Sequence, residues 1–196
     1  EMTKGKRVFV TGASGFIGTR LVDALVECGA QVCSFDARAA GGKRPGSSVT
    51  GDLRDRSIVR DAVKNAAPDL VFHLAAAKDR SIAAGDFDRL IQVNLTGSLN
   101  LLSALQEGAD VQSIVVVSTA EEYGGNPCPF TERMREAPVS AYSFSKMCMT
   151  RLCETFSMLH GMPLVILRPT LAYGPGQDTD MFLPSLINSL LDGTPF

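Results

Sequence analysis

A tyrosine and a lysine stand four residues apart in the segment Y-S-F-S-K, as Tyr142 and Lys146. At the start of a predicted helix, this spacing places the phenol and the ammonium on one helical face. A free tyrosine has a pKa of about 10, and a neighbouring positive charge lowers it because that charge stabilises the phenolate. The pair could therefore exchange a proton with a substrate hydroxyl, although Y-x-x-x-K alone is a weak signal that any surface helix can contain.

A glycine-rich segment, G-A-S-G-F-I-G at residues 12–18, lies between a predicted strand and a predicted helix. Glycines permit a tight turn there and let backbone N–H groups at the helix N-terminus approach a pyrophosphate. Asp36 ends the next strand, where it can accept hydrogen bonds from ribose hydroxyls. A turn that merely needs glycines is the alternative. We predict a dinucleotide site contacted first by Gly12, Gly15, Phe16, Ile17, Gly18 and Asp36.

The residues near Asp36 also bear on which dinucleotide is bound. A carboxylate at Asp36 would repel the 2′-phosphate of NADP, whereas Arg38, two residues later, could attract it. We predict that the cofactor is NAD, and Arg38 leaves NADP as the alternative.

Strand-like and helix-like segments alternate along the chain and must position these residues. We predict strands at 7–11, 31–36, 49–52, 70–74, 113–118 and 164–167. Between them we predict helices at 16–28, 56–66, 87–106 and 142–160, with an exposed loop at 37–48. This alternation is typical of an α/β protein with a doubly wound parallel sheet, the Rossmann fold.

The length of 196 residues corresponds to one complete domain and the start of another. We expect a NAD-binding Rossmann domain at 5–171. From residue 172 the sequence turns to Gly, Pro, Gln and Asp and then to a short apolar helix at 181–191. We expect 172–196 to be the beginning of a substrate-binding lobe that remains incomplete in this chain.

Composition disfavours several classes of function. Nineteen basic and 21 acidic side chains give a net charge of -2, which disfavours nucleic-acid binding. The longest apolar run has about seven residues against the roughly 20 of a membrane span, and the N-terminus lacks a secretory signal. Five cysteines without a C-x-x-C pair, and only two histidines, supply a zinc site poorly, so we predict no metal. We expect reduced thiols and a cytoplasmic location.

Taken together, these motifs resemble the short-chain dehydrogenase/reductase family. The resemblance rests on the glycine loop, the N-L-T-G segment from Asn94, Ser118-Thr119, and Tyr142 with Lys146. The spellings T-G-x-x-G-F-I-G, H-L-A-A at 73–76 and Y-G-P-G at 173–176 are similar to the extended branch. That branch contains NAD-dependent epimerases, dehydratases and decarboxylases of nucleotide sugars, with some reductases.

The resemblance implies a role for each matching residue. Tyr142 would be the general base or acid at a carbinol oxygen, Lys146 would hold the nicotinamide ribose, and Thr119 would hydrogen-bond the reacting hydroxyl. The remaining cofactor contacts that it implies are Asp52 and Leu53 beside the adenine, Leu74, Ala75, Ala76, Asn94 and Ser118 along the cofactor, and Pro169 and Thr170 near the carboxamide. Plainer interpretations remain open: Asp52 could cap a turn, His73 could be a hydrogen-bonded core residue, and Asn94 could be a polar contact within its helix.

Two positions depart from or qualify the pattern. Leu171 stands where extended-branch enzymes often have the Asn of R-x-x-N-x-Y-G-P, which helps to hold the sugar nucleotide. The triplet Thr119-Ala120-Glu121 resembles the T-D-E or T-S-E of sugar dehydratases and decarboxylases, but Ala120 lacks the acid that some dehydratases use. Glu121 could remove a proton alpha to a 4-keto group or merely contact substrate hydroxyls.

We therefore expect an NAD-dependent enzyme that removes a hydride from C4 of a nucleoside-diphosphate sugar and then epimerises or eliminates. An NAD(P)-dependent ketoreductase or alcohol dehydrogenase is the alternative within the same family, and a non-catalytic NAD(H)-binding scaffold or sensor is the alternative of another class. The resemblance also suggests a homodimer, with Phe144, Met147 and Met158 beside the 87–106 helix.

Overall fold

The protein folds around a single parallel sheet of six strands in the order β3-β2-β1-β4-β5-β6. The computed structural model describes residues 3–38, 46–78 and 84–195. The strands are β1 (Arg7–Thr11), β2 (Gln31–Asp36), β3 (Ser47–Thr50), β4 (Leu70–His73), β5 (Ser113–Val117) and β6 (Leu164–Leu167). The helices are α1 (Phe16–Glu27), α2 (Arg56–Ala66), α3 (Ala84–Leu90), the π-helix η1 (Ile91–Thr96), α4 (Gly97–Gly108), the 3-10 helix η2 (Ala120–Tyr123), α5 (Ala141–His160) and α6 (Phe182–Asp192). The predicted α/β fold with a parallel sheet is confirmed.

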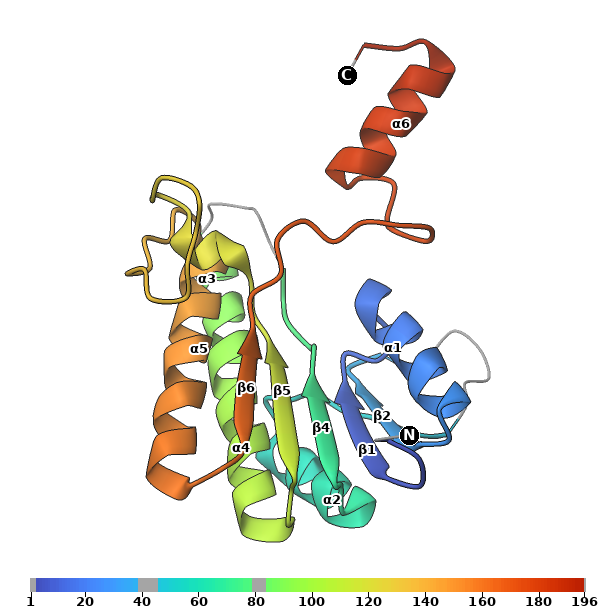
Figure 1. Cartoon of the computed structure of the whole chain (residues 1–196), viewed down its shortest axis with the longest axis vertical. Coiled ribbons are helices and arrows are strands. Elements are labelled where there is room, and N and C mark those ends of the chain that lie inside the picture. The colour runs from blue at the N-terminus through green and yellow to red at the C-terminus, as the bar shows by residue number, and fades with distance from the viewer. Residues whose placement is uncertain (1–2, 39–45, 79–83, 196) are drawn as a thin grey trace.

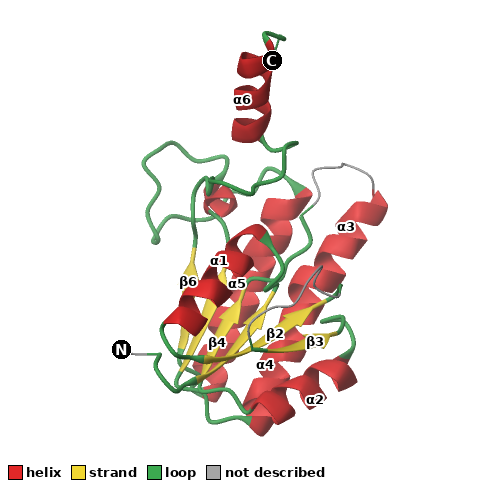
Figure 2. Cartoon of the chain, turned by 90° about the vertical axis from the view of Figure 1, so that its right-hand side faces the viewer, coloured by secondary structure: helices red, strands yellow, loops and turns green. Residues whose placement is uncertain are grey.

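Helices cover both faces of the sheet, so its central strands are apolar on both sides (Figures 1 and 2). On one face, α1 packs Val22 and Leu25 against Val8 and Val10 of β1. On the other face, α2, α4 and α5 build the larger core, in which Leu101 and Met149 are fully buried. Strands β1 to β3 are added toward one edge of the sheet, and β4 to β6 are added on the other side of β1, toward the opposite edge. The two halves of the sheet therefore meet between β1 and β4. In doubly wound sheets, this switch point is where ligands bind.

The predicted helix at 87–106 differs most from the structure. It is a helical run of α3, η1 and α4, interrupted by a π-helical turn at Ile91–Thr96. Asn94 lies in this turn and is fully buried, and its side chain bonds backbone outside the helix. The apolar periodicity that predicted the helix carries no sign of such a contact. The third strand is also shifted, because Ser47 and Ser48, predicted as loop, pair with β2; residues 39–45 of that loop lie outside the described residues.

The last helix projects away from the sheet at its carboxyl edge (Figure 1). Within Phe182–Asp192, α6 has no buried residue, and Leu190 and Leu191 are among the most exposed apolar side chains. None of the helices described is long and apolar enough to cross a membrane.

Candidate active site

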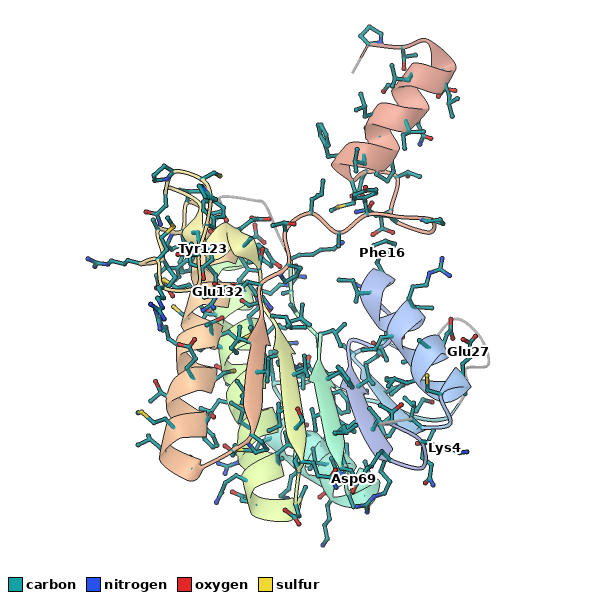
Figure 3. The ribbon with its side chains drawn as sticks, in the orientation of Figure 1. Lys4, Phe16, Glu27, Asp69, Tyr123 and Glu132 are labelled. Atoms are coloured by element: carbon teal, nitrogen blue, oxygen red, sulfur yellow. The ribbon has the colours of Figure 1, made fainter. Side chains whose placement is uncertain are left out.

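The carboxyl ends of the strands carry two clefts that meet at the glycine loop. The first cleft has a volume of about 700 Å³ and is lined by the ends of β1, β2 and β4. The second has a volume of about 320 Å³ and is lined by the loops after β5 and β6 and the start of α5. Both include Gly12, Gly15, Leu74 and Ala76. Figure 3 shows Phe16 and Tyr123 toward this edge and Asp69 at the opposite one.

The glycine loop needs glycine at two positions for steric reasons. Gly12 has a φ of 69°, and a Cβ there would lie 2.6 Å from the backbone nitrogen of Ala75. A Cβ on Gly18 would lie 2.8 Å from Cα of Ala13. Since real Cβ atoms do not approach backbone so closely, the β1–α1 turn can pass against the end of β4 only with glycine here. Gly15, Phe16 and Ile17, at the N-terminus of α1, line the second cleft.

The first cleft carries polar groups suited to an adenosine. Asp36 accepts a hydrogen bond from the backbone N–H of Ser14 at 2.9 Å, which fixes its carboxylate beside the glycine loop. The Ser14 hydroxyl is buried and has no hydrogen-bond partner among the described residues. Asp52 pairs with Arg54 at 2.6 Å, and the Arg54 hydrogen bond lowers the pKa of Asp52. A carboxylate, an unpaired hydroxyl and glycine backbone fit the ribose and pyrophosphate of a dinucleotide.

The start of α5 brings Tyr142 and Lys146 to the second cleft. Ser140 caps the helix, and its hydroxyl accepts the N–H of Ser143 at 3.0 Å in a reciprocal capping box. Tyr142 and Lys146 then follow in the first two turns and both line the cleft. Lys146 is only 2% exposed, and its Nζ donates to the carbonyl of Val117 at 2.7 Å. Burial lowers the pKa of Lys146 to about 8, an effect that the charge of Glu122 opposes.

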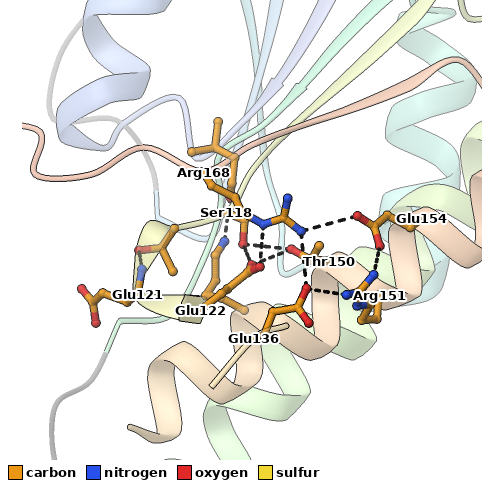
Figure 4. A network of polar contacts seen from close by, with 11 residues as sticks. Ser118, Glu121, Glu122, Glu136, Thr150, Arg151, Glu154 and Arg168 are labelled. Atoms are coloured by element: carbon orange, nitrogen blue, oxygen red, sulfur yellow. Dashed lines mark hydrogen bonds and ion pairs between the residues drawn. The ribbon is translucent and has the colours of Figure 1, made fainter. Parts of the chain in front are cut away.

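Thr119 and Glu121 reach the same cleft from the end of β5. Thr119 is 8% exposed and caps the N-terminus of η2, where its Oγ1 accepts the N–H of Glu121 at 3.2 Å. The Glu121 side chain is exposed and lines the cleft. The next residue, Glu122, is fully buried instead and pairs with Arg168 at 2.7 Å. Figure 4 shows Glu121 turned away from the polar network that surrounds Glu122.

Asn94 is the predicted cofactor contact that the structure places outside both clefts. Its Oδ1 accepts the N–H of Ala77 at 2.7 Å, and its Nδ2 donates to the Ala77 carbonyl at 3.0 Å and to Ser145 Oγ at 2.9 Å. Ser145 in turn donates to the carbonyl of Tyr142 at 2.7 Å. Asn94 thus joins the segment after β4 to the helix turn that carries Tyr142. Asn94 is therefore a contact between elements, which differs from the plainer interpretation of a polar contact within its own helix.

His73 lies in a buried chain of hydrogen bonds. The Ser98 hydroxyl donates to the carbonyl of Asn94 at 2.5 Å, so His73 Nε2, 2.8 Å away, must donate to Ser98. His73 Nδ1 then accepts from Thr11 Oγ1 at 2.6 Å. Burial lowers the pKa of His73 to about 3, with a smaller contribution from the positive charge of Lys146. His73 is therefore a neutral core histidine that connects β1, β4 and α4.

The two clefts together contain every other predicted site residue. These are Gly12, Gly15, Phe16, Ile17, Gly18, Asp36, Asp52, Leu53, Leu74, Ala75, Ala76, Ser118, Thr119, Glu121, Tyr142, Lys146, Pro169 and Thr170. The sequence did not point to the cleft residues Ser14, Arg54 and Arg89 in the first cleft or Lys78, Gln177 and Asp178 in the second. Arg54 follows Asp52 by two residues, a spacing that could have suggested an ion pair; the others carry no comparable signal.

Comparison with known proteins gives relatives along nearly the whole chain. The chain is 31% identical over 211 residues to a probable dTDP-glucose 4,6-dehydratase of Sinorhizobium fredii, covering 96% of this chain and 60% of the relative. It is 28% identical to a probable UDP-glucuronate 4-epimerase of Rhizobium meliloti, with 96% and 60% covered. The chain thus spans 60% of the length of these curated relatives.

Solved structures share the fold. MoeE5 in complex with UDP-glucuronic acid and NAD has a TM-score of 0.85 at 34% identity, with 96% of this chain and 62% of that chain covered. The UDP-glucose 4-epimerase of Thermotoga maritima, with UDP-glucose, has a TM-score of 0.86 at 29% identity, with 95% and 63% covered. The NAD dependent epimerase/dehydratase family matches residues 8–196. With the glycine loop, the two clefts and the Tyr142–Lys146 helix in place, this chain belongs to the NAD-dependent epimerase/dehydratase family.

Proposed function

We propose that this chain carries the NAD-binding and catalytic part of an enzyme that modifies a nucleoside-diphosphate sugar by transient oxidation at C4. The observation that carries the proposal is that the first cleft, which carries Asp36 and the glycine backbone, meets Thr119, Tyr142 and Lys146 at the glycine loop. Residues 5–171 form the NAD-binding domain in this proposal, and residues 172–196 begin the substrate-binding lobe.

The proposed chemistry divides between cofactor and protein. NAD held by the glycine loop, Asp36 and Lys146 would supply a reversible hydride acceptor for the carbinol carbon. The Tyr142 hydroxyl takes the proton of the carbinol oxygen, Thr119 hydrogen-bonds that oxygen, and the Lys146 ammonium favours the phenolate by its charge. Holding the three groups at one cleft orients the substrate for transfer, which is a large part of enzymatic rate enhancement.

The substrates of the relatives support the substrate class. These include dTDP-glucose, UDP-glucuronate and UDP-glucose, and one solved neighbour contains UDP-glucuronic acid together with NAD. We carry the class, a nucleoside-diphosphate sugar, to this chain and leave the sugar open.

Glu121 decides between chemistry at C4 alone and further chemistry at C5. Its exposed carboxylate lines the second cleft and could remove a proton alpha to a transient ketone. In that case Glu121→Gln still reduces NAD when a substrate sugar nucleotide is added, because hydride transfer does not need the carboxylate. The variant then accumulates the 4-keto sugar and stops exchanging the C5 hydrogen with deuterated solvent, as followed by NMR.

The comparison needs the wild-type enzyme beside the variant. If the wild type incorporates no solvent deuterium at C5 during turnover, Glu121 serves only to bind substrate. The function is then narrowed to 4-epimerisation or to ketone reduction.

An NAD(P)-dependent ketoreductase is the second candidate, and one residue favours it. Leu171 lines the second cleft and is 57% exposed, where the extended branch often has a substrate-binding Asn. Cofactor that remains bound through purification and is not consumed supports the epimerase or dehydratase. Stoichiometric consumption of free NADH supports the ketoreductase.

We also propose a homodimer that works in the cytoplasm. Support for the dimer comes from exposed apolar side chains on neighbouring helices: Phe87 and Phe144, whose ring centroids are 5.5 Å apart, with Leu99 and Met158. Light scattering after gel filtration tests it, and a monomer mass would refute it. Support for a reducing compartment comes from the five cysteines, all described and all free thiols.

A further inference from the structure

Glu122 is the centre of a buried polar network that joins three elements (Figure 4). Its Oε1 accepts a hydrogen bond from the Ser118 hydroxyl and lies 2.6 Å from Thr150 Oγ1. Its Oε2 accepts Nε–H of Arg168 at 2.7 Å. Glu122 is 0% exposed, and the Arg168 side chain is 12% exposed. One carboxylate therefore fastens the end of β5, the middle of α5 and the segment after β6.

Each residue that Glu122 holds is next to a proposed functional residue. Ser118 precedes Thr119, Arg168 precedes Pro169, and Thr150 lies one helical turn after Lys146. These neighbours, Thr119, Lys146 and Pro169, all line the second cleft. Because one carboxylate binds the residue beside each of them, a displacement at Glu122 would move all three. None of these contacts involves Glu121, although the two glutamates are adjacent.

The charges of the network are unbalanced without Lys146. Arg168 also lies 3.4 Å from Glu154 and 3.9 Å from Glu136, and Arg151 pairs with the same two carboxylates. Three glutamates, Glu122, Glu136 and Glu154, thus face two arginines, which leaves one negative charge over. The Lys146 ammonium, which is buried close by and interacts electrostatically with Glu122, supplies the matching positive charge.

The other titratable groups that face Lys146 are uncharged near neutral pH. Burial lowers the pKa of His73, on β4, to about 3, so its imidazole is neutral. Burial raises the pKa of the Cys153 thiol, on α5 itself, to about 12. From η2, Glu122 therefore supplies the negative charge that acts on Lys146. Glu122 also pairs with Arg168 and interacts electrostatically with Tyr123.

We propose that Glu122 is a positioning residue: its buried carboxylate holds the residues next to Thr119, Pro169 and the Lys146 turn at one point and presents its negative charge to the Lys146 ammonium. This inference rests on the proposed role of Lys146 at the ribose. It assigns separate tasks to the two adjacent glutamates, with Glu121 at the substrate and Glu122 acting through its neighbours.

The test is an NMR titration of the Lys146 side chain in the full chain without cofactor. The chain has six lysines, so ¹³C labelling at lysine Cε gives a short spectrum, in which Lys146→Arg identifies the resonance. We expect Lys146 to titrate at about 8 in the wild type. In Glu122→Gln, which keeps the size of the side chain and removes its charge, we expect that pKa to fall by about one unit. The matched control Glu121→Gln should leave it in place.

The pH dependence of NAD affinity provides a second measurement, because a loss of stability alone would not change the pH at which affinity falls. The dissociation constant of NAD, measured from about pH 6 to about pH 10, should begin to rise at a pH about one unit lower in Glu122→Gln than in the wild type. An unchanged Lys146 pKa in Glu122→Gln, or an equal fall in Glu121→Gln, overturns the proposal. If the wild type does not bind NAD, the proposed function fails, but the lysine titration still decides the role of Glu122.

A measurement on the wild type covers the case in which Glu122→Gln does not fold. With ¹³C labelling at glutamate Cδ, the Glu122 resonance should show an inflection at the pKa of Lys146, because the two charges interact. Absence of that inflection overturns the proposal without any variant of Glu122.

Discussion

The hydroxyl of Tyr142 is the group whose removal should affect the chemistry most. The phenol lines the second cleft, in the first turn of α5 and four residues before Lys146. Tyr142→Phe removes only the oxygen that exchanges the proton, so turnover should fall by about 10²–10⁴-fold. NAD affinity should change little, because Lys146 and the glycine loop remain. Steady-state kinetics with a nucleotide sugar, together with NAD titration, measures both.

Tyr123→Phe provides a matched control for the loss of a hydroxyl. Tyr123 is 3% exposed, and its hydroxyl has no partner among the described residues. It should therefore retain turnover within about twofold. A Tyr142→Phe enzyme that works as fast as this control would exclude Tyr142 as the acid or base.

Some residues of the site could be predicted from the sequence and others could not. Tyr142, Lys146 and Asp36 were predicted because their spacing from neighbouring residues reflects local geometry, and the structure places all three at the clefts. Glu122 was not predicted, because its partner Arg168 is 46 residues away. Such a contact depends on β5 and β6 being neighbours in the sheet, which no local pattern encodes.

At the scale of elements, the N-terminus of α5 fixes the position of Tyr142. The Ser140 hydroxyl satisfies the N–H of Ser143, which would otherwise lack a partner within the helix. Ser140→Ala should lower the free energy of unfolding by about 1 kcal/mol, as measured by urea titration. Ser140→Asp, which keeps a capping acceptor, should lose much less. Equal losses in the two variants would show that the cap does not stabilise the helix.

The His73 chain joins β1, β4 and α4 and should make the fold sensitive to acid. Burial holds the pKa of His73 at about 3, against about 6.5 in an unfolded chain. Between these values the unfolded state binds a proton that the folded state does not, so stability is complete above pH 6.5 and falls as the pH drops. From pH 7 to pH 5 the free energy of unfolding should fall by about 2 kcal/mol.

His160, the other histidine, provides the control for this measurement. It is exposed at the end of α5, so His160→Gln should retain the fall between the two pH values. His73→Gln should lose most of it, whatever its stability at pH 7. The range stays above the region in which Asp69, with a pKa lowered to about 2 by Arg7, takes up its proton. Equal stability of the wild type at the two pH values would contradict a buried neutral His73.

Elements were predicted well where apolar periodicity decides them. The ranges of β1, α2 and β6 agree residue for residue, since each is an apolar run or an amphipathic stripe with clear limits. The π-helix at Ile91–Thr96 could not be predicted, because it accompanies side-chain bonds from Asn94 to backbone beyond its own helix. The predicted range of the third strand, 49–52, was two residues too late, because the serines at the start of Ser47–Thr50 are typical of loops in the sequence.

For the whole molecule, the strand order sets where the proposed chemistry can occur. The strand order reverses between β1 and β4, which is the switch point of the sheet. At this point Gly12, after β1, packs on Ala75, after β4. Both clefts include these two loops, with Asp36 on the β2 side and Thr119 on the β5 side. A dinucleotide lying across the switch point would thus place its adenosine over β2 and its reactive end beside Tyr142. The proposed chemistry requires this placement of the cofactor.

Titration calorimetry of this chain with NAD and with NADP tests that placement most directly. We predict saturable binding of one NAD, tighter than NADP by at least about tenfold, or about 1.4 kcal/mol, because Asp36 would repel the 2′-phosphate. Asp36→Asn should reduce the difference in affinity between NAD and NADP. Arg38→Ala, in the same cleft, should not reduce that difference. Absence of saturable NAD binding would contradict the dinucleotide site itself, and equal affinities for NAD and NADP would contradict the role of Asp36.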